Sequence, residues 1–364
     1  MKFAKNHSSD SSAQQSKDDI EAMLLSQLDD LGDGITETGP VETVSEEVIW
    51  SETAKASNIT SEAMNLAQDI LVKIKKNQSV KVDPLARVTK QMFSSFSRDK
   101  EALTSLAMLK YKDNHLFNHS VQVSIYMLAL AKKMGFSEKD QIMVSIGGLL
   151  QDVGLAKLPK DILQKKGKLT ANERKFVQMH VDFGIHVIKS MDDVSPLVIN
   201  ILTQHHERLD GTGYPKKLRG GSISREGRMA AVVDSFAAIT SKRSYRKQLE
   251  NHVALRAIMK GNKEKYDMGI VQNFIQCVGV FPVGSTVKLA DGTICVVVRN
   301  NVGDLLHPIV RPVVTVSGSK LQDEKLLNLL FYKQDKTKII TGHVDPGKAG
   351  INPLDYLPNS DVYR

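Results

Sequence analysis

Apolar residues recur at three- and four-residue steps over much of the chain, which is the spacing of one face of an α-helix. This pattern becomes regular at Ser61, resumes after Pro84 towards Leu109, and continues through residues 115–280 without a credible strand. The clearest stripes are Ala63, Leu66, Ala67, Ile70, Leu71 and Ile74; Ala102, Leu103, Leu106 and Leu109; Val121, Ile125, Leu128 and Ala129; and Ile142, Ile146, Leu149 and Leu150. The sequence therefore predicts a mainly α fold with an all-helical bundle at its centre.

The starts of the later helical segments can also be placed in the sequence. Thr170 with Glu173 forms a capping box, which predicts a helix that runs through His180 towards Ile188. Ser224 opens another helix with an apolar stripe, and the segment from Asp267 to Val280 is the last of the helical set.

After Pro282 the spacing of apolar residues changes from a helical to a strand-like pattern. Val283–Leu289 and Ile294–Val298 flank the turn residues Asp291-Gly292, and Ile309–Val316 follows. Apolar, β-branched runs around an Asp-Gly turn are typical of a hairpin. Residues 283 to about 345 are therefore expected to form a small β appendage of three to five strands.

The same shifts in composition suggest four parts. Residues 1–60 are expected to be an acidic, largely disordered segment, with a short amphipathic helix over Ile20–Leu31. A helical N-terminal region over 61–110, a bundle over 111–281, and the β appendage with a tail over 282–364 would follow.

Charge is unevenly distributed along the chain. The net charge is +8, yet residues 1–50 carry eleven Asp and Glu against three Lys and Arg. The rest is strongly basic, which favours a phosphate-bearing small ligand. The sequence shows no arginine-rich tract or alternation of aromatic and basic residues, so a polynucleotide partner is not expected. Two cysteines, no signal peptide and no membrane-length apolar run predict a cytoplasmic protein.

Six residues have the chemistry of metal ligands and are spread over separate helical segments. They are His119, Asp152, His180, His205, His206 and Asp234. A single histidine on a helix is more often structural than metal-binding. Asp152 and Asp234, however, interrupt apolar runs, and a carboxylate buried alone is costly, so each should have a metal or a strong hydrogen-bond partner. Six such groups in one bundle predict a centre for a first-row divalent metal.

The segment His205–Pro215 is the most specific in the chain. Adjacent histidines point about 100° apart on a helix, so both reach one ion only near the helix end. The turn residues Asp210-Gly211-Thr212-Gly213-Tyr214-Pro215 follow directly. These residues predict either the end of a helix followed by an ordinary loop, or a loop that binds a ligand beside the metal.

With these motifs, roughly residues 100–280 resemble the HD-GYP family, the cyclic di-GMP phosphodiesterase branch of the HD superfamily. The resemblance is carried by Phe117-Asn118-His119-Ser120, Gln151-Asp152-Val153-Gly154, Lys168-Leu169-Thr170 with Glu173, His180, His205–Pro215, and Asp234 with Arg243-Ser244-Tyr245-Arg246.

The resemblance implies two or three metal ions, commonly iron or manganese, and hydrolysis of cyclic di-GMP to pGpG or GMP by a two-metal displacement at phosphorus. Asp152, the expected catalytic residue, would bridge the ions. His180, His205 and His206 would hold one, and His119 with Asp234 the other; His115 corresponds weakly to a third-metal ligand. The substrate-binding residues would be Arg208, Asp210, Gly211, Gly213, Tyr214 and Pro215.

Two departures from the family pattern bear on activity. Gln151 stands where the family has a ligand histidine, and an amide oxygen is a poorer ligand than imidazole for iron or manganese. A single bound ion is therefore the alternative to a centre of two ions. Leu155 stands where many members have a phosphate-binding lysine. Lys157 lies two residues further on, but the local backbone should direct it elsewhere.

Two functions therefore stay open. The first is a cyclic di-GMP signalling protein, impaired in or lacking hydrolysis, that binds the dinucleotide or a partner protein, among them other cyclic di-GMP signalling proteins. The alternative is an active metal-dependent phosphodiesterase. A purely structural bundle is disfavoured by the retained ligands, and a homodimer is left open.

Overall fold

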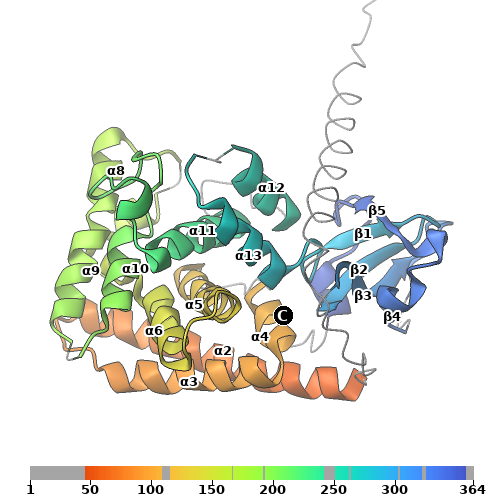
Figure 1. Ribbon diagram of the computed structural model, residues 1–364, viewed down its shortest axis with the longest axis horizontal. Helices are drawn as coiled ribbons and strands as arrows, with labels where there is room; N and C mark the ends of the chain where they lie inside the picture. The colour runs from red at the N-terminus through yellow and green to blue at the C-terminus, as the bar shows by residue number, and fades with distance from the viewer. Residues whose placement is uncertain are drawn as a thin grey trace, which may run out of the picture.

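The computed structural model describes residues 46–108, 115–165, 167–191, 193–241, 251–261, 264–301, 304–321 and 325–357. They form a bundle of helices with a small twisted sheet at one end (Figure 1). The predicted mainly α fold with a C-terminal β appendage is confirmed. The stretch Ile20–Leu31 and the motif Arg243–Arg246 lie outside the described residues.

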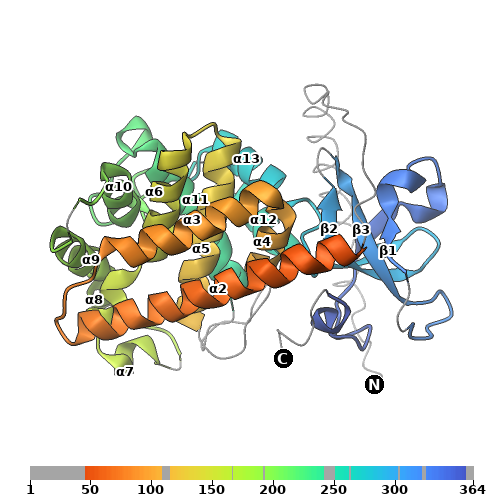
Figure 2. The ribbon, with the colours of Figure 1, turned by 90° about the horizontal axis from the view of Figure 1, so that it is seen from below.

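Two long helices, α2 (Glu46–Lys75) and α3 (Val82–Arg98), lie side by side along one face of the bundle (Figure 2). The expectation that residues up to 60 are largely disordered is wrong for 46–60, because α2 already begins at Glu46. Its early inward positions are small and partly polar: Thr53, Ala56, Ser57 and Thr60 are buried. A pattern based on large apolar residues does not detect such a face.

The second predicted helix starts at Val82 and is interrupted at Asp99. The Asp99 carboxylate accepts hydrogen bonds from the backbone N–H groups of Glu101 (3.0 Å) and Ala102 (3.2 Å). An aspartate in this position satisfies the free N–H groups of a new helix. The segment therefore divides into α3 and α4 (Lys100–Met108).

The bundle is built around α5 (His115–Lys133), whose inward side chains are almost fully buried. Tyr126 of α5 makes edge-to-face contacts with Phe236 and Phe274, at 5.7 and 5.6 Å between ring centroids. The surrounding elements are α6 (Glu138–Leu150), η1 (Val153–Lys157), α7 (Lys160–Leu163), α8 (Ala171–Gln178), α9 (His180–Lys189), α10 (Pro196–Gln204), η2 (Gly220–Ser222), α11 (Arg225–Thr240), α12 (Asn251–Gly261) and α13 (Met268–Val278).

The predicted helix starts are confirmed. Thr170 and Glu173 form the reciprocal capping box, and Ser224 and Asp267 cap α11 and α13. The helix expected from Thr170 to Ile188 is broken at Met179 into α8 and α9. This break places His180 at the start of α9.

The sheet has the strand order β4-β3-β2-β1-β5, and every adjacent pair is antiparallel. The hairpin predicted at Asp291-Gly292 joins β1 and β2, with Thr286 paired to Val296. The strands are β1 (Thr286–Leu289), β2 (Ile294–Asn301), β3 (Asp304–Val314), β4 (Leu327–Asn328) and β5 (Ile340–His343), with the short turns η3 (Leu329–Tyr332), η4 (Lys336–Lys338) and η5 (Pro353–Tyr356).

Strand β2 alternates its side chains between two cores. Val296 and Val298 belong to the core of the helical bundle, whereas Cys295 and Val297 belong to a smaller core within the sheet. Successive residues of a strand point to opposite faces, so the sheet is anchored to the bundle by one face. Among the described residues, no helix is both long and apolar enough to span a bilayer.

Candidate metal centre

The six predicted ligands come together in the middle of the bundle. His119 lies in the first turns of α5, Asp152 directly after α6, and His180 at the start of α9. His205 and His206 follow the last residue of α10, and Asp234 lies within α11. Within the described residues, their ligand atoms form two groups that share Asp152. We call Asp152, His180, His205 and His206 the three-histidine site, and His119, Asp152 and Asp234 the second site.

In the three-histidine site, hydrogen bonds to backbone carbonyl oxygens hold the Nδ1 atoms of two histidines in place. His180 Nδ1 lies 2.8 Å from the Val177 carbonyl oxygen, and His205 Nδ1 lies 2.9 Å from that of Leu202. A carbonyl only accepts hydrogen bonds, so each Nδ1 carries a proton and donates it. Histidine ligands of metals are oriented in this way, with Nε2 left free for the ion.

The two free nitrogens then face each other. His180 Nε2 lies 3.3 Å from His205 Nε2, and Asp152 Oδ1 lies 3.3 Å from the former and 3.8 Å from the latter. Two lone pairs and a carboxylate oxygen at these distances repel one another unless a proton or a cation lies among them. The four residues therefore fit a divalent metal ion by their donor set and by their orientation.

The ionisation states of Asp152, His180 and His206 also favour a bound metal ion. Burial alone would raise the pKa of Asp152, but His205, His180 and His119 hold that pKa well below its ordinary value. Burial lowers the pKa of His180 and, together with the charge of His205, places the pKa of His206 well below its usual range. Asp152 is thus an anion, and His180 and His206 are neutral near pH 7, which are the forms that bind metals. Burial opposes the protonation of His205, but the hydrogen bond and the charge of Asp152 raise its pKa, so an ion at this site displaces the Nε2 proton of His205.

The second site is satisfied in a different way. Gln151 is fully buried, and its amide nitrogen donates a hydrogen bond to Asp234 Oδ1 at 2.9 Å. His119 Nε2 lies 3.0 Å from the same oxygen. The Gln151 Oε1 atom is buried without a hydrogen-bond partner, and so is His119 Nδ1. The Gln151 amide thus satisfies an oxygen of the Asp234 carboxylate with a hydrogen bond instead of offering a ligand atom to an ion.

To serve as a ligand, Gln151 would have to rotate its amide and turn Oε1 towards the ion. That rotation breaks its hydrogen bond to Asp234. His119 also lacks a hydrogen-bond partner on Nδ1, unlike His180 and His205, so its orientation is less constrained. The second site is the weaker of the two as a metal site.

The loop after the paired histidines packs tightly against them. Tyr214 stacks on His206 with 4.5 Å between ring centroids, and its backbone N–H donates to the His206 carbonyl. A side chain at Gly213 would lie 2.5 Å from Glu207 Cα, so only glycine allows this approach. The Tyr214–Pro215 peptide is cis. The loop expected to grip a ligand therefore borders the metal centre.

Glu207 holds this loop, a role that the sequence reasoning did not assign. Its side chain is fully buried, and its two oxygens accept hydrogen bonds from the backbone N–H groups of Lys216 (2.7 Å) and Leu218 (3.0 Å). The available signal was a lone carboxylate between His206 and Arg208, followed by a turn whose N–H groups need acceptors.

Two predicted substrate-binding residues are engaged within the protein. Arg208 donates to the carbonyls of His205 and Glu207 and to Ser235 Oγ. Asp210 Oδ1 accepts hydrogen bonds from the backbone N–H and the hydroxyl of Thr212. These contacts shape the loop. Gly211 has a φ of 78°, while Tyr214 and Pro215 lie at the surface side of the turn.

Lys157 does not point into the metal centre, as expected. Its ammonium group contacts the end of α2 instead, so it does not replace the family lysine at position 155. His115 begins α5, but its side chain lies outside the described residues.

Residues 104–270 match the HD domain family. A cyclic di-GMP phosphodiesterase from Pseudomonas aeruginosa is 35% identical over 260 residues, which cover 71% of this chain and 58% of that protein. The 3′3′-cGAMP-specific phosphodiesterase 2 of Vibrio cholerae is 37% identical over 129 residues, covering 35% of this chain and 25% of the relative. A cyclic di-GMP phosphodiesterase from Thermotoga maritima is 32% identical over 178 residues, 48% of each protein.

The chain thus spans between a quarter and three fifths of the length of these relatives. Among solved structures, an HDG"Y"P protein from Bdellovibrio bacteriovorus superimposes with a TM-score of 0.51 and 20% identity, covering 70% of this chain and 79% of the other. At that identity the likeness concerns the fold alone.

Proposed function

Because the chain belongs to the HD-GYP family, we propose that it is a cyclic di-GMP signalling protein that binds the dinucleotide beside one firmly held metal ion and hydrolyses it weakly or not at all. Iron or manganese suits the mixed imidazole and carboxylate donors of the three-histidine site.

The observation that carries this proposal is the contact between Gln151 and Asp234. An amide that donates to the carboxylate of the second site competes with an ion there. In two-metal phosphoester hydrolysis, one ion stabilises the attacking oxygen and the other the leaving oxygen. Loss of several kcal/mol of transition-state stabilisation lowers turnover by orders of magnitude, since about 1.4 kcal/mol corresponds to a factor of ten.

Binding depends on different residues, and these are retained. The Tyr214 ring beside His206 offers an aromatic surface for a base, and Glu207 keeps its loop in place. The chain beyond residue 50 is strongly basic, which attracts a ligand with two phosphates. Recognition of the dinucleotide can therefore persist when hydrolysis is impaired.

An active phosphodiesterase is the second candidate, and one observation favours it. The bridging position Asp152 and the second-site residues His119 and Asp234 lie within reach of a common ion. Rotation of the Gln151 amide would add a fourth donor. In this case the second ion would bind weakly, and activity would appear only at high metal concentration.

Calorimetry with cyclic di-GMP, combined with chromatography of the reaction products, tests the proposal. We expect each chain to bind one dinucleotide. Little pGpG or GMP should form over hours in the presence of Mn²⁺. Tyr214→Ala should weaken binding, whereas Tyr332→Ala, an exposed tyrosine on η3, should not. Fast formation of pGpG would favour the active enzyme, and absence of binding would reject both candidates. A parallel titration with 3′3′-cGAMP compares the two dinucleotides.

A further inference from the structure

Lys157 ties the segment that carries Asp152 to the end of helix α2. Its Nζ atom donates to the Ile74 carbonyl at 2.9 Å and to Asn77 Oδ1 at 2.6 Å. Asn77 has a φ of 55°, the left-handed conformation in which helices often end. A lysine at this position also interacts favourably with the negative end of the helix dipole.

Lys157 and Asp152 belong to one short, stiff unit. The 3₁₀ turn η1 begins immediately after Asp152, and the Leu155 N–H donates to the Asp152 carbonyl at 2.9 Å. On its other side, Gly154 packs so closely on α9 that an added Cβ would lie 1.9 Å from the His180 carbonyl oxygen. A displacement of η1 therefore displaces the Asp152 carboxylate relative to His119 and His205, which belong to α5 and to the end of α10.

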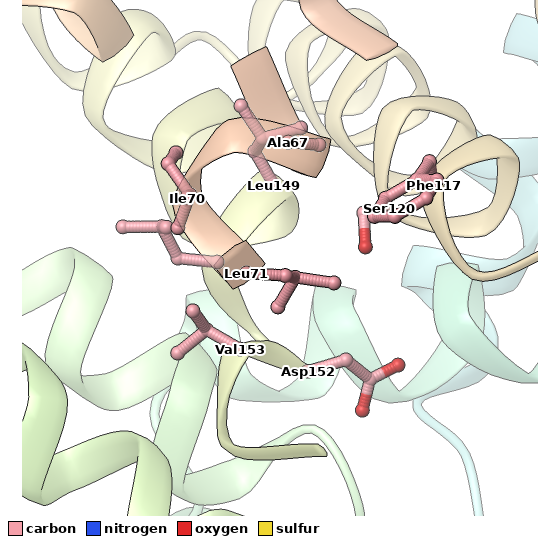
Figure 3. A pocket seen from close by; sticks show the side chains of 9 residues that line it. Ala67, Ile70, Leu71, Phe117, Ser120, Leu149, Asp152 and Val153 are labelled. Carbon is pink, nitrogen blue, oxygen red and sulfur yellow. The ribbon is translucent and has the colours of Figure 1, made fainter. Parts of the chain in front are cut away.

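A cavity of about 10 Å³ lies between α2 and this unit (Figure 3). Ala67, Ile70 and Leu71 of α2 form one wall, and Asp152 and Val153 form another. This is about the room that one water molecule needs. This gap lies between α2 and the Asp152–Val153 segment, so the Lys157 contacts supplement the packing of α2 on that segment.

We propose that α2 sets the position of the bridging carboxylate through η1, and that Lys157 is the positioning residue that links them. Helix α2 spans 30 residues and extends to the sheet end of the molecule (Figure 2). A ligand or partner that shifts α2 would thereby alter the metal centre without touching it. The inference rests on the proposed function only in requiring that the three-histidine site binds a metal ion.

A Co²⁺ titration of the metal-free protein, followed by the visible absorption of the bound ion, tests this role without any measurement of activity. Lys157→Met keeps the side-chain length but removes the ammonium group. We expect its Co²⁺ affinity to fall about 3- to 10-fold, less than the roughly 10- to 100-fold loss for partners that hydrogen-bond a ligand directly, because Lys157 acts through η1. Lys157→Arg should recover part of the loss, and Lys160→Met, which removes a nearby exposed lysine, should bind as the unmodified protein does.

Asn77→Gly provides a second, milder variant. Glycine retains the left-handed backbone and removes only the side-chain acceptor, so this protein should fold even if Lys157→Met does not. It should weaken Co²⁺ binding, and the double variant should bind no more weakly than Lys157→Met alone. Unchanged affinity in both single variants would overturn the positioning role. Failure of the unmodified protein to bind Co²⁺ would instead reject the metal site itself.

Discussion

At the scale of single residues, the Gln151 side chain makes the second site differ from the three-histidine site. Gln151 replaces an expected imidazole ligand with an amide that satisfies Asp234 by hydrogen bonding. The three-histidine site keeps two histidines oriented by backbone carbonyls, whereas the second site has no such fixed imidazole among the described residues. The two sites therefore differ both in donors and in preorganisation.

Gln151→His should restore the second site. An imidazole at this buried position adds a good nitrogen ligand beside His119 and Asp234 and removes the competing amide donor. We expect cyclic di-GMP hydrolysis to rise at least tenfold, which corresponds to about 1.4 kcal/mol of transition-state stabilisation. Initial rates of pGpG formation measure this. Gln151→Ala, which removes the donor without adding a ligand, is the control and should stay slow. Equal rates in both variants would contradict the role given to Gln151.

Gly154→Ala should destabilise the junction of η1 and α9. The new methyl group would lie 1.9 Å from the His180 carbonyl oxygen and 2.6 Å from the Gly184 nitrogen. Backbone atoms on both sides leave no flexible neighbour to move, so we expect a loss of about 3 kcal/mol, the upper end for overpacking. Urea unfolding of the metal-free protein gives the value. Gly221→Ala, where the added carbon meets nothing within 4 Å, should leave the midpoint unchanged.

At the scale of elements, the loop Gly211–Leu218 depends on a single buried carboxylate. Glu207→Ala leaves the N–H groups of Lys216 and Leu218 without their acceptor. An unsatisfied buried group costs about 1–3 kcal/mol, so the loop should lose its fixed conformation. We expect weaker cyclic di-GMP binding by calorimetry with an unchanged metal content.

Glu226→Ala is the matched control for this variant. Glu226 is also buried, but it lies on α11 and accepts its hydrogen bond from Asn200 of α10 and not from the loop. Loss of stability without loss of ligand affinity is expected there. If Glu207→Ala bound the dinucleotide normally, the loop would not contribute to recognition.

The elements also show what the sequence could predict. Helix starts with a side-chain cap, such as Thr170 and Ser224, were predictable because the cap is a local interaction. The first turns of α2 were not, because Thr53, Ala56 and Ser57 are buried by neighbouring helices rather than by their own apolarity. The break at Met179 also escaped prediction, since the pattern continues across it.

At the scale of the whole molecule, an ion pair joins the helices to the sheet. Arg299 of β2 makes two hydrogen bonds of 2.8 Å to Asp99, which lies 200 residues earlier and caps α4. The side chains are 14% and 9% exposed, so the pair is largely removed from water. Together with Val296 and Val298, it fixes the sheet on the bundle.

Arg299→Leu should destabilise the protein by about 3–5 kcal/mol at pH 7, because Asp99 would remain as an uncompensated, nearly buried charge. Adding Asp99→Asn in the same chain should recover part of that loss. Arg87→Leu removes an exposed arginine paired with Glu62 at 3.4 Å and should change stability by less than about 1 kcal/mol. Thermal unfolding monitored by circular dichroism gives all three values, and similar effects at positions 87 and 299 would contradict this account.

The arrangement of the site shows a similar limit to prediction. The chemical types and order of His119, Asp152, His180, His205, His206 and Asp234 indicated one centre, and the structure brings all six together. The sequence did not reveal that the Gln151 amide donates to Asp234, nor that Lys157 contacts α2. Both depend on side chains that are about 80 residues apart in the chain.

The central claim is that one ion is held firmly and the second is not. Elemental analysis of protein purified without oxygen and dialysed against metal-free buffer tests it most directly. We expect one iron or manganese ion per chain, and about two in Gln151→His. Two tightly held ions in the unmodified protein would contradict the claim.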